Sequence, residues 1–158
     1  LEQAMDFLDL AATIALSSTC LRSHCGSIIV QGGEIIGKGY NSPPCDTTLE
    51  RCLKDDLPVD FKSDKTCCMH AEQRAIIDAL QHFPAGIKSS KLYFIRLDEE
   101  GNKKPSGQPY CTICSKMSLD VGIAEFVLWH EEGIAVYGTK EYNELSFQFQ
   151  ILSIKRMI

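Results

Sequence analysis

The chain has 158 residues, of which 44% are hydrophobic, so residues 1–158 are expected to form a single domain with its own core. The 16 basic and 21 acidic residues give a net charge of −5, which argues against a protein that grips duplex nucleic acid along its phosphates. Neither a signal-peptide pattern nor an apolar stretch long enough to cross a bilayer is present, so we expect no membrane partner and a cytoplasmic location.

The first 66 residues predict a helix, a β-hairpin and a long connection. Apolar residues recur at helical spacing over residues 2–19. The segment "CGSIIVQGGEIIGKGYN" (25–41) then contains two β-branched runs joined by Gly32–Gly33, which indicates a hairpin. Residues 41–66 are polar and rich in proline and aspartate, so we expect one long loop with at most one turn of helix. A loop of this length inside a compact domain is usually functional or held in place by other contacts.

The rest of the chain alternates helices and strands. The predicted elements are a helix over 69–83, a strand over 91–97, a loop over 98–108, a helix over 109–121 and a strand over 123–130. Because strands separated by helices imply crossover connections, we expect an α/β fold with a three-layer α/β/α arrangement. The tail has two interpretations. Either "GIAVYG" (133–138) pairs antiparallel with the strand before it, or Thr139 caps a short helix and "FQFQI" (147–151) forms the last strand.

Two short motifs at predicted helix starts can combine into a metal site. "CTIC" places Cys111 and Cys114 at a spacing that lets two thiolates point at one ion, and a helix N-terminus stabilises their charge. Alone, this spacing also fits a redox pair or two buried cysteines. His70, in "CCMHAEQRAIIDAL" (67–80), adds a third ligand. Three protein ligands leave one position of a tetrahedral zinc ion open to water, which is the pattern of a catalytic site.

A carboxylate beside such a metal would complete the chemistry. Zinc lowers the pKa of a bound water to about 7 and so supplies hydroxide at neutral pH. Glu72 follows His70 by two residues and is placed to move protons without binding the metal. His-x-Glu on a helix, then a strand, then Cys-x-x-Cys on the next helix is the signature of zinc nucleobase deaminases. We therefore expect one catalytic Zn²⁺ held by His70, Cys111 and Cys114, with Glu72 as the catalytic residue.

The chain resembles the zinc-dependent cytidine/deoxycytidylate deaminase superfamily from about residue 5 to residue 130. The resemblance rests on "HAE" (70–72), "CTIC" (111–114), "GSIIV…GEIIGKGYN" (26–41) and the helix leading to "STCLRSHCG" (18–26). The stretch "STCLR…GSIIV…GYNSPP" is most similar to deoxycytidylate deaminases. The resemblance implies a cytidine deaminase-like fold, with a mixed sheet of about five strands between helices. Relatives often assemble, so a homo-oligomer is compatible with the resemblance, but the sequence does not define the oligomeric state.

The same resemblance implies three substrate contacts. Asn41, in "GYN", would contact the sugar or the base edge, and the N–H of Ala71 would contact the base carbonyl. A peptide carbonyl at Pro109 would accept the substrate amino group. The family usually has proline directly before the first cysteine of the motif, whereas Tyr110 stands there in this chain. This difference affects the position of the carbonyl and the stacking of the base. Turn chemistry before Ser42–Pro43 would also explain Asn41.

The chain has eight cysteines, more than a catalytic zinc site needs. Long periodic segments argue against a small disulfide-rich scaffold. Some deoxycytidylate deaminases hold the region of the long loop with a second, structural zinc, which would explain how a loop poor in apolar residues stays folded. The alternative is a set of unliganded thiols. The candidate ligands are Cys45, Cys52, Cys67 and Cys68, whereas Cys20 and Cys25 are expected to be packing residues.

Three functions are compatible with the sequence. The leading hypothesis is a zinc-dependent hydrolytic deaminase of a nucleobase in a free nucleotide or nucleoside, most like deoxycytidylate or cytidine deamination. The second is a deaminase of a base in single-stranded RNA or DNA, which needs an unpaired base and a basic channel. The third is a non-catalytic, zinc-stabilised interaction module with four protein ligands. The acidic net charge and the resemblance favour the first, so nucleic acid is the less favoured partner. Arg22, Lys38 and Arg51 are candidate phosphate contacts or solvated surface charges.

Overall fold

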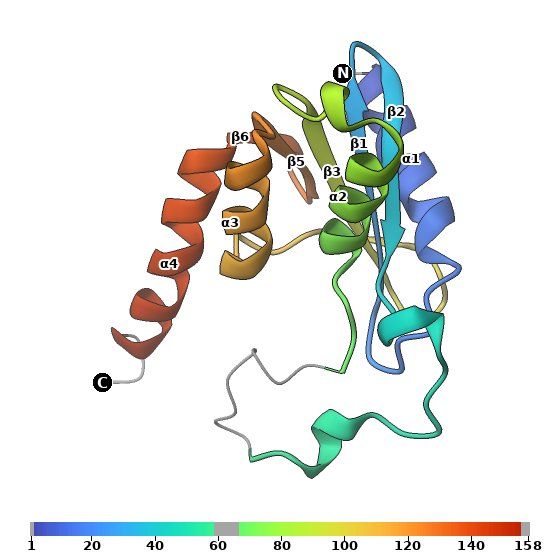
Figure 1. Ribbon diagram of the computed structural model, residues 1–158. Helices are drawn as coiled ribbons and strands as arrows, with labels where there is room; N and C mark the ends of the chain where they lie inside the picture. Colours follow the sequence, from blue (N-terminus) through green and yellow to red (C-terminus); the bar gives the residue numbers. More distant parts are fainter. Residues whose placement is uncertain (1, 59–66, 156–158) are drawn as a thin grey trace.

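The computed structural model describes residues 2–58 and 67–155 (Figure 1). The helices are α1 (Glu2–Ala15), α2 (Ala71–His82), α3 (Thr112–Val121) and α4 (Thr139–Lys155). The strands are β1 (His24–Gln31), β2 (Glu34–Tyr40), β3 (Lys91–Leu97), β4 (Lys103–Lys104), β5 (Glu125–His130) and β6 (Gly133–Gly138). Short 3-10 turns occur at η1 (Pro44–Asp46), η2 (Leu53–Asp56) and η4 (Pro84–Gly86). Among the described helices, none has the length and apolar character that a membrane span requires.

One mixed sheet forms the centre of the molecule. Its strands lie in the order β2-β1-β3-β5-β6, and the two-residue β4 pairs with β3. β3 and β5 are parallel, and the other neighbours are antiparallel. The crossover through α3 produces the parallel pair, because parallel strands cannot be joined by a tight turn. The predicted mixed sheet of about five strands is confirmed.

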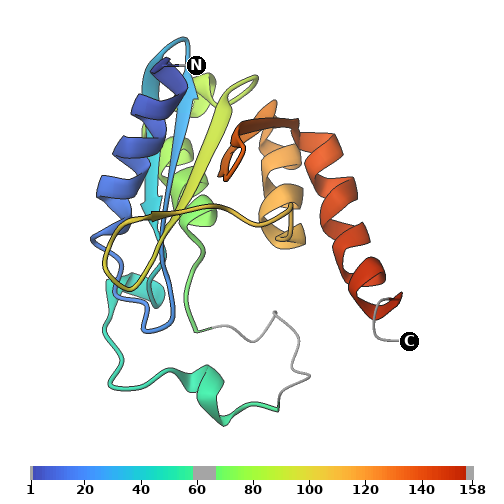
Figure 2. The same ribbon diagram turned by 180° about the vertical axis from the view of Figure 1, so that it is seen from behind.

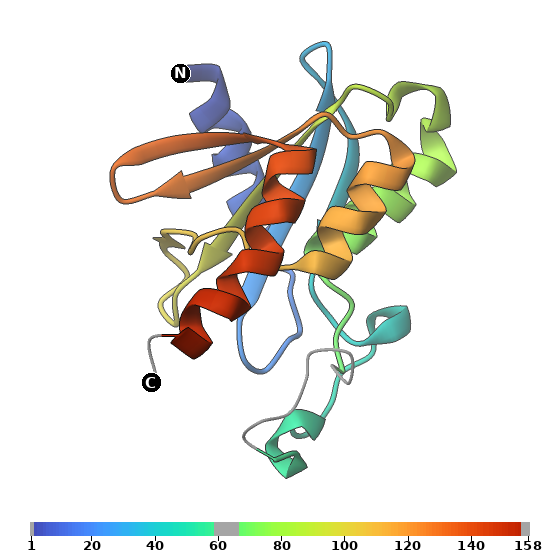
Figure 3. The same cartoon turned by 90° about the vertical axis from the view of Figure 1, so that its left-hand side faces the viewer.

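Helices cover both faces of this sheet. Of the described helices, α1 packs on one face, and α2, α3 and α4 lie on the other (Figures 1 and 2). Side chains alternate between the two layers as the period of a strand requires: Ile28 packs in the α1 cluster and its neighbour Ile29 packs with α2. Figure 3 shows α3 and α4 side by side on their face of the sheet. The expected three-layer α/β/α fold is confirmed.

Two glycines of β2 let α2 lie unusually close to the sheet. A Cβ atom at Gly39 would come within 2.3 Å of the Ala71 carbonyl oxygen, and one at Gly37 within 2.4 Å of the Ala75 carbonyl oxygen. Any larger residue would therefore collide with the helix backbone. Because α2 begins at Ala71, this contact sets the position of the first turn of α2 relative to the sheet.

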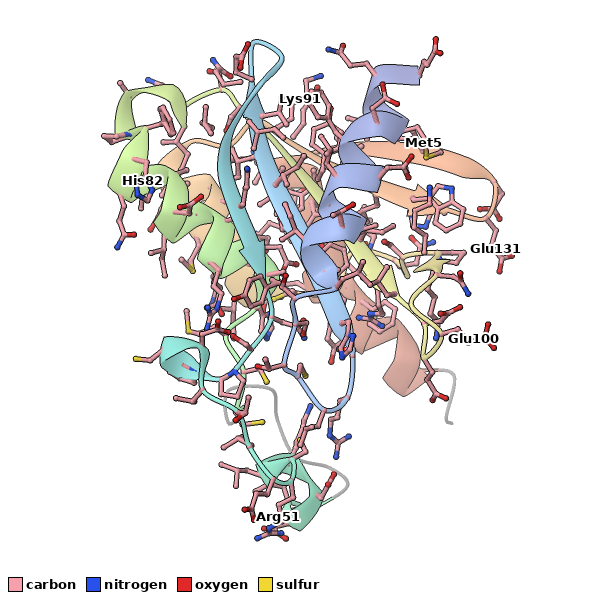
Figure 4. All side chains as sticks on the ribbon, turned by 90° about the vertical axis from the view of Figure 1, so that its right-hand side faces the viewer. Met5, Arg51, His82, Lys91, Glu100 and Glu131 are labelled. Carbon is pink, nitrogen blue, oxygen red and sulfur yellow. The ribbon has the colours of Figure 1, made fainter. Side chains whose placement is uncertain are left out.

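The long connection after β2 differs in detail from the expectation. Its described part contains the two 3-10 turns η1 and η2, where at most one turn was expected, and residues 59–66 lie outside the described residues. A backbone bridge between Ser42 and Met69, with Met69 N–H donating to Ser42 O at 2.8 Å, holds the two ends of the connection together. Arg51 lies at the far end of the connection, away from the sheet (Figure 4).

The C-terminal segment combines parts of both interpretations of the tail. β6 pairs antiparallel with β5, as the first interpretation predicts. Thr139 then begins the 17-residue α4, and residues 147–151 belong to this helix, so the prediction of a last strand at "FQFQI" is wrong. Tyr142 and Ser146, four residues apart, are buried together, because α4 presents one helical face to the rest of the protein. The loop predicted over 98–108 also contains β4.

Candidate active site

Three predicted metal ligands meet between the starts of two helices. His70 immediately precedes α2, and Cys111 and Cys114 flank the first residues of α3. His70 Nδ1 lies 3.3 Å from Cys111 Sγ and 3.2 Å from Cys114 Sγ, and the two sulfur atoms are 2.9 Å apart. Among residues 2–58 and 67–155, these three residues form a possible metal site, because their ligand atoms all lie within 4.8 Å of one another.

The donor set fits zinc. Zinc takes tetrahedral nitrogen and sulfur ligands at about 2.0–2.3 Å, so three donors this close together can bind one ion. Cys111 is the N-cap of α3, and its Sγ accepts a hydrogen bond from the Cys114 N–H at 3.3 Å. The backbone N–H groups of a helix start favour negative charge, which suits thiolate ligands. The contact with Cys114 lowers the pKa of Cys111 to about 4, while the pKa of Cys114 is raised.

Glu72 lies on the first turn of α2 with only 5% of its surface exposed. Burial raises the pKa of Glu72 to about 7, and the negative charge of Cys111 contributes to that rise. The Glu72 side chain also hydrogen-bonds with Cys114, so it lies directly beside the ligand group. A buried carboxyl beside a metal site and open to a cavity can receive and return protons without leaving its position.

His70, Cys111 and Glu72 line a cavity of about 490 Å³, and the buried Cys114 is not among its lining residues. Asn41 and Ala71 line it as well, so the structure brings two of the three expected substrate contacts to the site. Pro109 is buried and is not among the lining residues, whereas its neighbour Tyr110 is. An aromatic ring therefore borders the cavity immediately before the first cysteine ligand.

Asn41 organises the edge of the cavity. Its Oδ1 accepts hydrogen bonds from Ser18 Oγ at 2.7 Å and from the Cys25 N–H at 2.8 Å, and its Nδ2 donates to Ser23 O at 2.8 Å. Asn41 is thus more than a turn residue, because it links the end of β2 to the segment that precedes β1. These bonds use one of the two amide hydrogens and leave the second for a substrate atom.

A second group of thiols lies at the same cavity. Cys20, Cys52, Cys67 and Cys68 all line it, whereas Cys45 is exposed and is not among the lining residues. Cys52 Sγ and Cys67 Sγ are 3.8 Å apart. The side chain of Cys68 interacts with Cys20 and Cys67. Burial, together with these two contacts, raises the pKa of Cys68. The structure therefore brings in Cys20, expected to be a packing residue, in place of Cys45. It does so because the segment before β1 folds against the connection between β2 and α2.

Several lining residues were not predicted from the sequence. Tyr142 and Phe149 reach the cavity from α4, and Lys54 and Arg96 reach it from η2 and β3. Tyr142 and Phe149 are seven residues apart, a spacing that places two side chains on one helical face. A helical interpretation of the tail would therefore have placed Tyr142 and Phe149 on the same side of the helix. Lys54 and Arg96 carried no local signal, because neither lies near a motif in sequence. Of the candidate phosphate contacts, Arg22 lines the cavity, whereas Lys38 and Arg51 do not.

The chain matches a family model described as the cytidine and deoxycytidylate deaminase zinc-binding region, over residues 1–130. It is 29% identical over 80 residues to a deoxycytidylate deaminase of Schizosaccharomyces pombe. That match covers 46% of this chain and 24% of the relative, so it spans about a quarter of the relative's length.

Solved structures share the fold at low sequence identity. The dCMP deaminase of the cyanophage S-TIM5 in apo form superposes with a TM-score of 0.57, at 22% identity over 79% of this chain and 80% of the other. The same enzyme in complex with dCMP and dUMP gives a TM-score of 0.56, at 24% identity over 77% and 76%. A cytidine deaminase from Burkholderia pseudomallei gives 0.58, at 15% identity over 87% and 94%. With a family model matched over residues 1–130, this chain belongs to the cytidine and deoxycytidylate deaminase family that this zinc-binding region defines.

Proposed function

We propose that the protein is a zinc-dependent hydrolytic deaminase of a nucleobase carried by a free nucleotide, of the deoxycytidylate or cytidine type. The observation that carries the proposal is the buried Glu72 beside the group of His70, Cys111 and Cys114, at the wall of a cavity of about 490 Å³. A cavity of this volume suits a small organic ligand. Family membership supports a deaminase, and the single-domain organisation of residues 1–158 is part of the proposal.

The roles of the residues follow from their positions. Zinc, held by His70, Cys111 and Cys114, would act as the Lewis acid that makes a water molecule nucleophilic at neutral pH. Glu72 would take a proton from that water and deliver it to the ring nitrogen of the base. It would then take the remaining proton from the hydroxyl group added to the ring carbon and deliver it to the amino group, which leaves as ammonia as the carbonyl forms. Because Glu72 is on a helix and is buried, its carboxyl stays oriented toward the site throughout.

The substrate contacts are proposed from the cavity wall. Ala71 is the first residue of α2, and the first N–H groups of a helix lack partners within it, so its N–H is suited to bind the base carbonyl. The second amide hydrogen of Asn41 would bind the sugar or the base edge. The carbonyl at Pro109, or that of Tyr110 which follows it, would accept the substrate amino group. The position of this carbonyl depends on the conformation of the loop that leads into α3.

The charges at the cavity favour a nucleotide over a nucleoside. Arg22, Lys54 and Arg96 line it, and Glu72 is the one carboxylate among the described lining residues. Arg22 also forms an exposed ion pair with Asp55, which competes with a substrate phosphate for its guanidinium group. Lys54 and Arg96 have fewer such competing partners. A phosphate group would be attracted to this group of cations. In the related cyanophage enzyme, the solved complex contains dCMP and dUMP.

A single-stranded nucleic acid substrate is the second candidate, favoured by the same cations. A strand would need a basic channel that continues beyond one phosphate. An ammonia-release screen over bases, nucleosides, nucleotides and short single strands separates the candidates. Release from dCMP or another mononucleotide, and little from the matching nucleoside, is the expected result. Release from oligonucleotides alone, weakening steeply with salt, would favour the second candidate.

We further propose a second, structural zinc, now with Cys20, Cys52, Cys67 and Cys68 as ligands. The support is the chain of thiol contacts from Cys20 through Cys68 and Cys67 to Cys52, although these four are more widely spaced than the His70 group. Four protein ligands are typical of structural sites. Such an ion would join the connection between β2 and α2 to the segment before β1.

Metal counting tests this second site. Purified protein is expected to hold two zinc ions per chain. Cys67→Ser should reduce the count to one, because the catalytic zinc at His70, Cys111 and Cys114 is retained. Cys45→Ser is the matched control, because Cys45 is exposed outside the cavity. One zinc per chain in the unaltered protein, with no change on Cys67→Ser, would contradict the proposal and leave the catalytic site unaffected.

A further inference from the structure

The helix α4 forms part of the cavity although it lies beyond the family's matched region. The match to the family model ends at residue 130 of this chain, and α4 spans Thr139–Lys155. Even so, Tyr142 and Phe149 of α4 line the same cavity as Glu72 and Cys111. Residues that contact the ligand space but lie outside the shared region are well placed to distinguish one family member's substrate from another's.

Tyr142 anchors α4 at this position. Its ring stacks on Phe126 of β5, with centroids 4.1 Å apart and an angle of 18° between the ring planes. Burial raises the pKa of Tyr142 far above its ordinary value, and a hydrogen bond with the backbone of Tyr110 opposes that rise. The next residue of the same helix also makes a contact: Asn143 Oδ1 accepts a hydrogen bond from Ser115 Oγ of α3 at 2.8 Å. The helix is thus attached to the sheet, to α3 and to the loop that carries Cys111.

Two aromatic rings meet edge to face at the cavity. Phe149 and Tyr110 make an edge-to-face contact with centroids 5.3 Å apart and an angle of 89°. Both rings line the cavity, yet Phe149 is 39% exposed and Tyr110 is 54% exposed. A planar base can stack on an exposed aromatic face of this kind. Tyr110 is also bonded directly to the ligand Cys111, so its ring cannot lie far from the reacting base.

We propose that Phe149 and Tyr110 form an aromatic clamp on which the base of the substrate stacks, so that α4 contributes to substrate binding. The proposal rests on the proposed nucleotide deaminase function. It assigns these two residues to substrate affinity, and leaves proton transfer to Glu72. It also gives a role to the tyrosine that replaces the family's usual proline.

Phe147 provides a matched control on the same helix. It is two residues from Phe149, is 51% exposed, and is not among the residues that line the cavity. The full chain with zinc bound is used, in a Glu72→Gln background that prevents turnover during binding measurements. Phe149→Ala, Phe149→Leu and Phe147→Ala are compared by calorimetric binding of dCMP and of 2-deoxyribose 5-phosphate, which lacks the base. If the ammonia screen identifies another nucleotide as substrate, that nucleotide and its base-free counterpart replace this pair.

Phe149→Ala should weaken nucleotide binding about 10-fold, since base–aromatic stacking contributes on this scale. Binding of the base-free probe should not change, and Phe149→Leu should fall between Phe149→Ala and the unaltered residue. With Glu72 intact, Phe149→Ala should raise KM and leave kcat within about 3-fold, because the rings do not take part in proton transfer. Phe147→Ala should match the parent protein. Unchanged nucleotide affinity in Phe149→Ala, or equal weakening of both probes, would overturn the clamp. Failure of the unaltered protein to release ammonia from any compound would instead overturn the proposed function, and the clamp with it.

Discussion

Replacing Glu72 with glutamine should remove turnover while the zinc site stays occupied. Glutamine has nearly the same volume, so the buried position on the first turn of α2 is still filled. Glu72 is the one carboxylate among the described residues at the cavity, so no second carboxylate can take over its proton transfer. General acid–base catalysis contributes about 10²–10⁴-fold, and here one group serves both the attacking water and the leaving amine. We therefore expect kcat to fall about 10³–10⁴-fold, which corresponds to about 4–5.5 kcal/mol in the barrier.

The assay is steady-state ammonia release on the substrate identified by the screen, with zinc content measured on the same sample. Glu99→Gln, in an exposed loop, is the matched control and should behave as the unaltered protein. A Glu72→Gln variant that retains zinc and stays within about 10-fold of normal turnover would refute the proton-transfer role, because that loss is below the range of general acid–base catalysis.

Three further changes test the site and the scaffold that holds it. Cys114→Ser should lower bound zinc, and turnover with it, in metal analysis and ammonia release, whereas Cys45→Ser should leave zinc at the catalytic site in place; unchanged metal content in Cys114→Ser would contradict the ligand assignment. Gly39→Ala should lower the free energy of unfolding by about 1–3 kcal/mol in urea titrations, since its Cβ would overlap the backbone of α2. Gly138→Ala, with nothing within 4 Å of the added carbon, should be nearly neutral, and equal effects of the two would rule out the steric account. Asn41→Ala should cost about 1–3 kcal/mol, because it leaves a buried backbone N–H unpaired. If the free energy of unfolding of Asn41→Ala is unchanged within experimental error, a water molecule must take over the hydrogen bonds of the Asn41 amide.

The two motifs of the candidate site were visible in the local sequence, because His70 and Glu72 lie at one helix start and Cys111 and Cys114 at another. That the two motifs come together was expected from the deaminase signature, and the structure brings His70, Cys111 and Cys114 within 4.8 Å of one another. The sheet was predictable for a similar reason, since Gly32–Gly33 specifies a hairpin and the alternating strands and helices require crossovers. These signals depend on neighbours in sequence, which the sequence displays directly.

The parts that could not be predicted depend on distant segments meeting. The alternation of Phe147, Gln148 and Phe149 has the period of a strand, yet these residues are helical because α4 packs through Tyr142 and Ser146. Tertiary packing outweighs a local pattern in such cases. Likewise, nothing near Cys20 in sequence shows that it faces the thiols of the connection before α2. The ring contact between Tyr110 and Phe149 joins two segments whose relative position only the folded chain defines.

The central place of β3 in the sheet has a consequence for the order of folding. The hairpin of β1 and β2 closes locally, whereas β3 must insert between β1 and β5, and its pairing with β1 joins Val30 to Lys91. His70 precedes β3 and Cys111 follows it, so the metal ligands come from segments on both sides of this central strand in sequence. Contacts between distant parts of a chain form slowly, because a long loop must close first. We therefore expect tight zinc binding to be among the last events of refolding. After dilution from urea, uptake followed with a zinc-sensitive dye should lag behind the recovery of sheet circular dichroism; uptake that precedes it would show that the metal nucleates the fold instead.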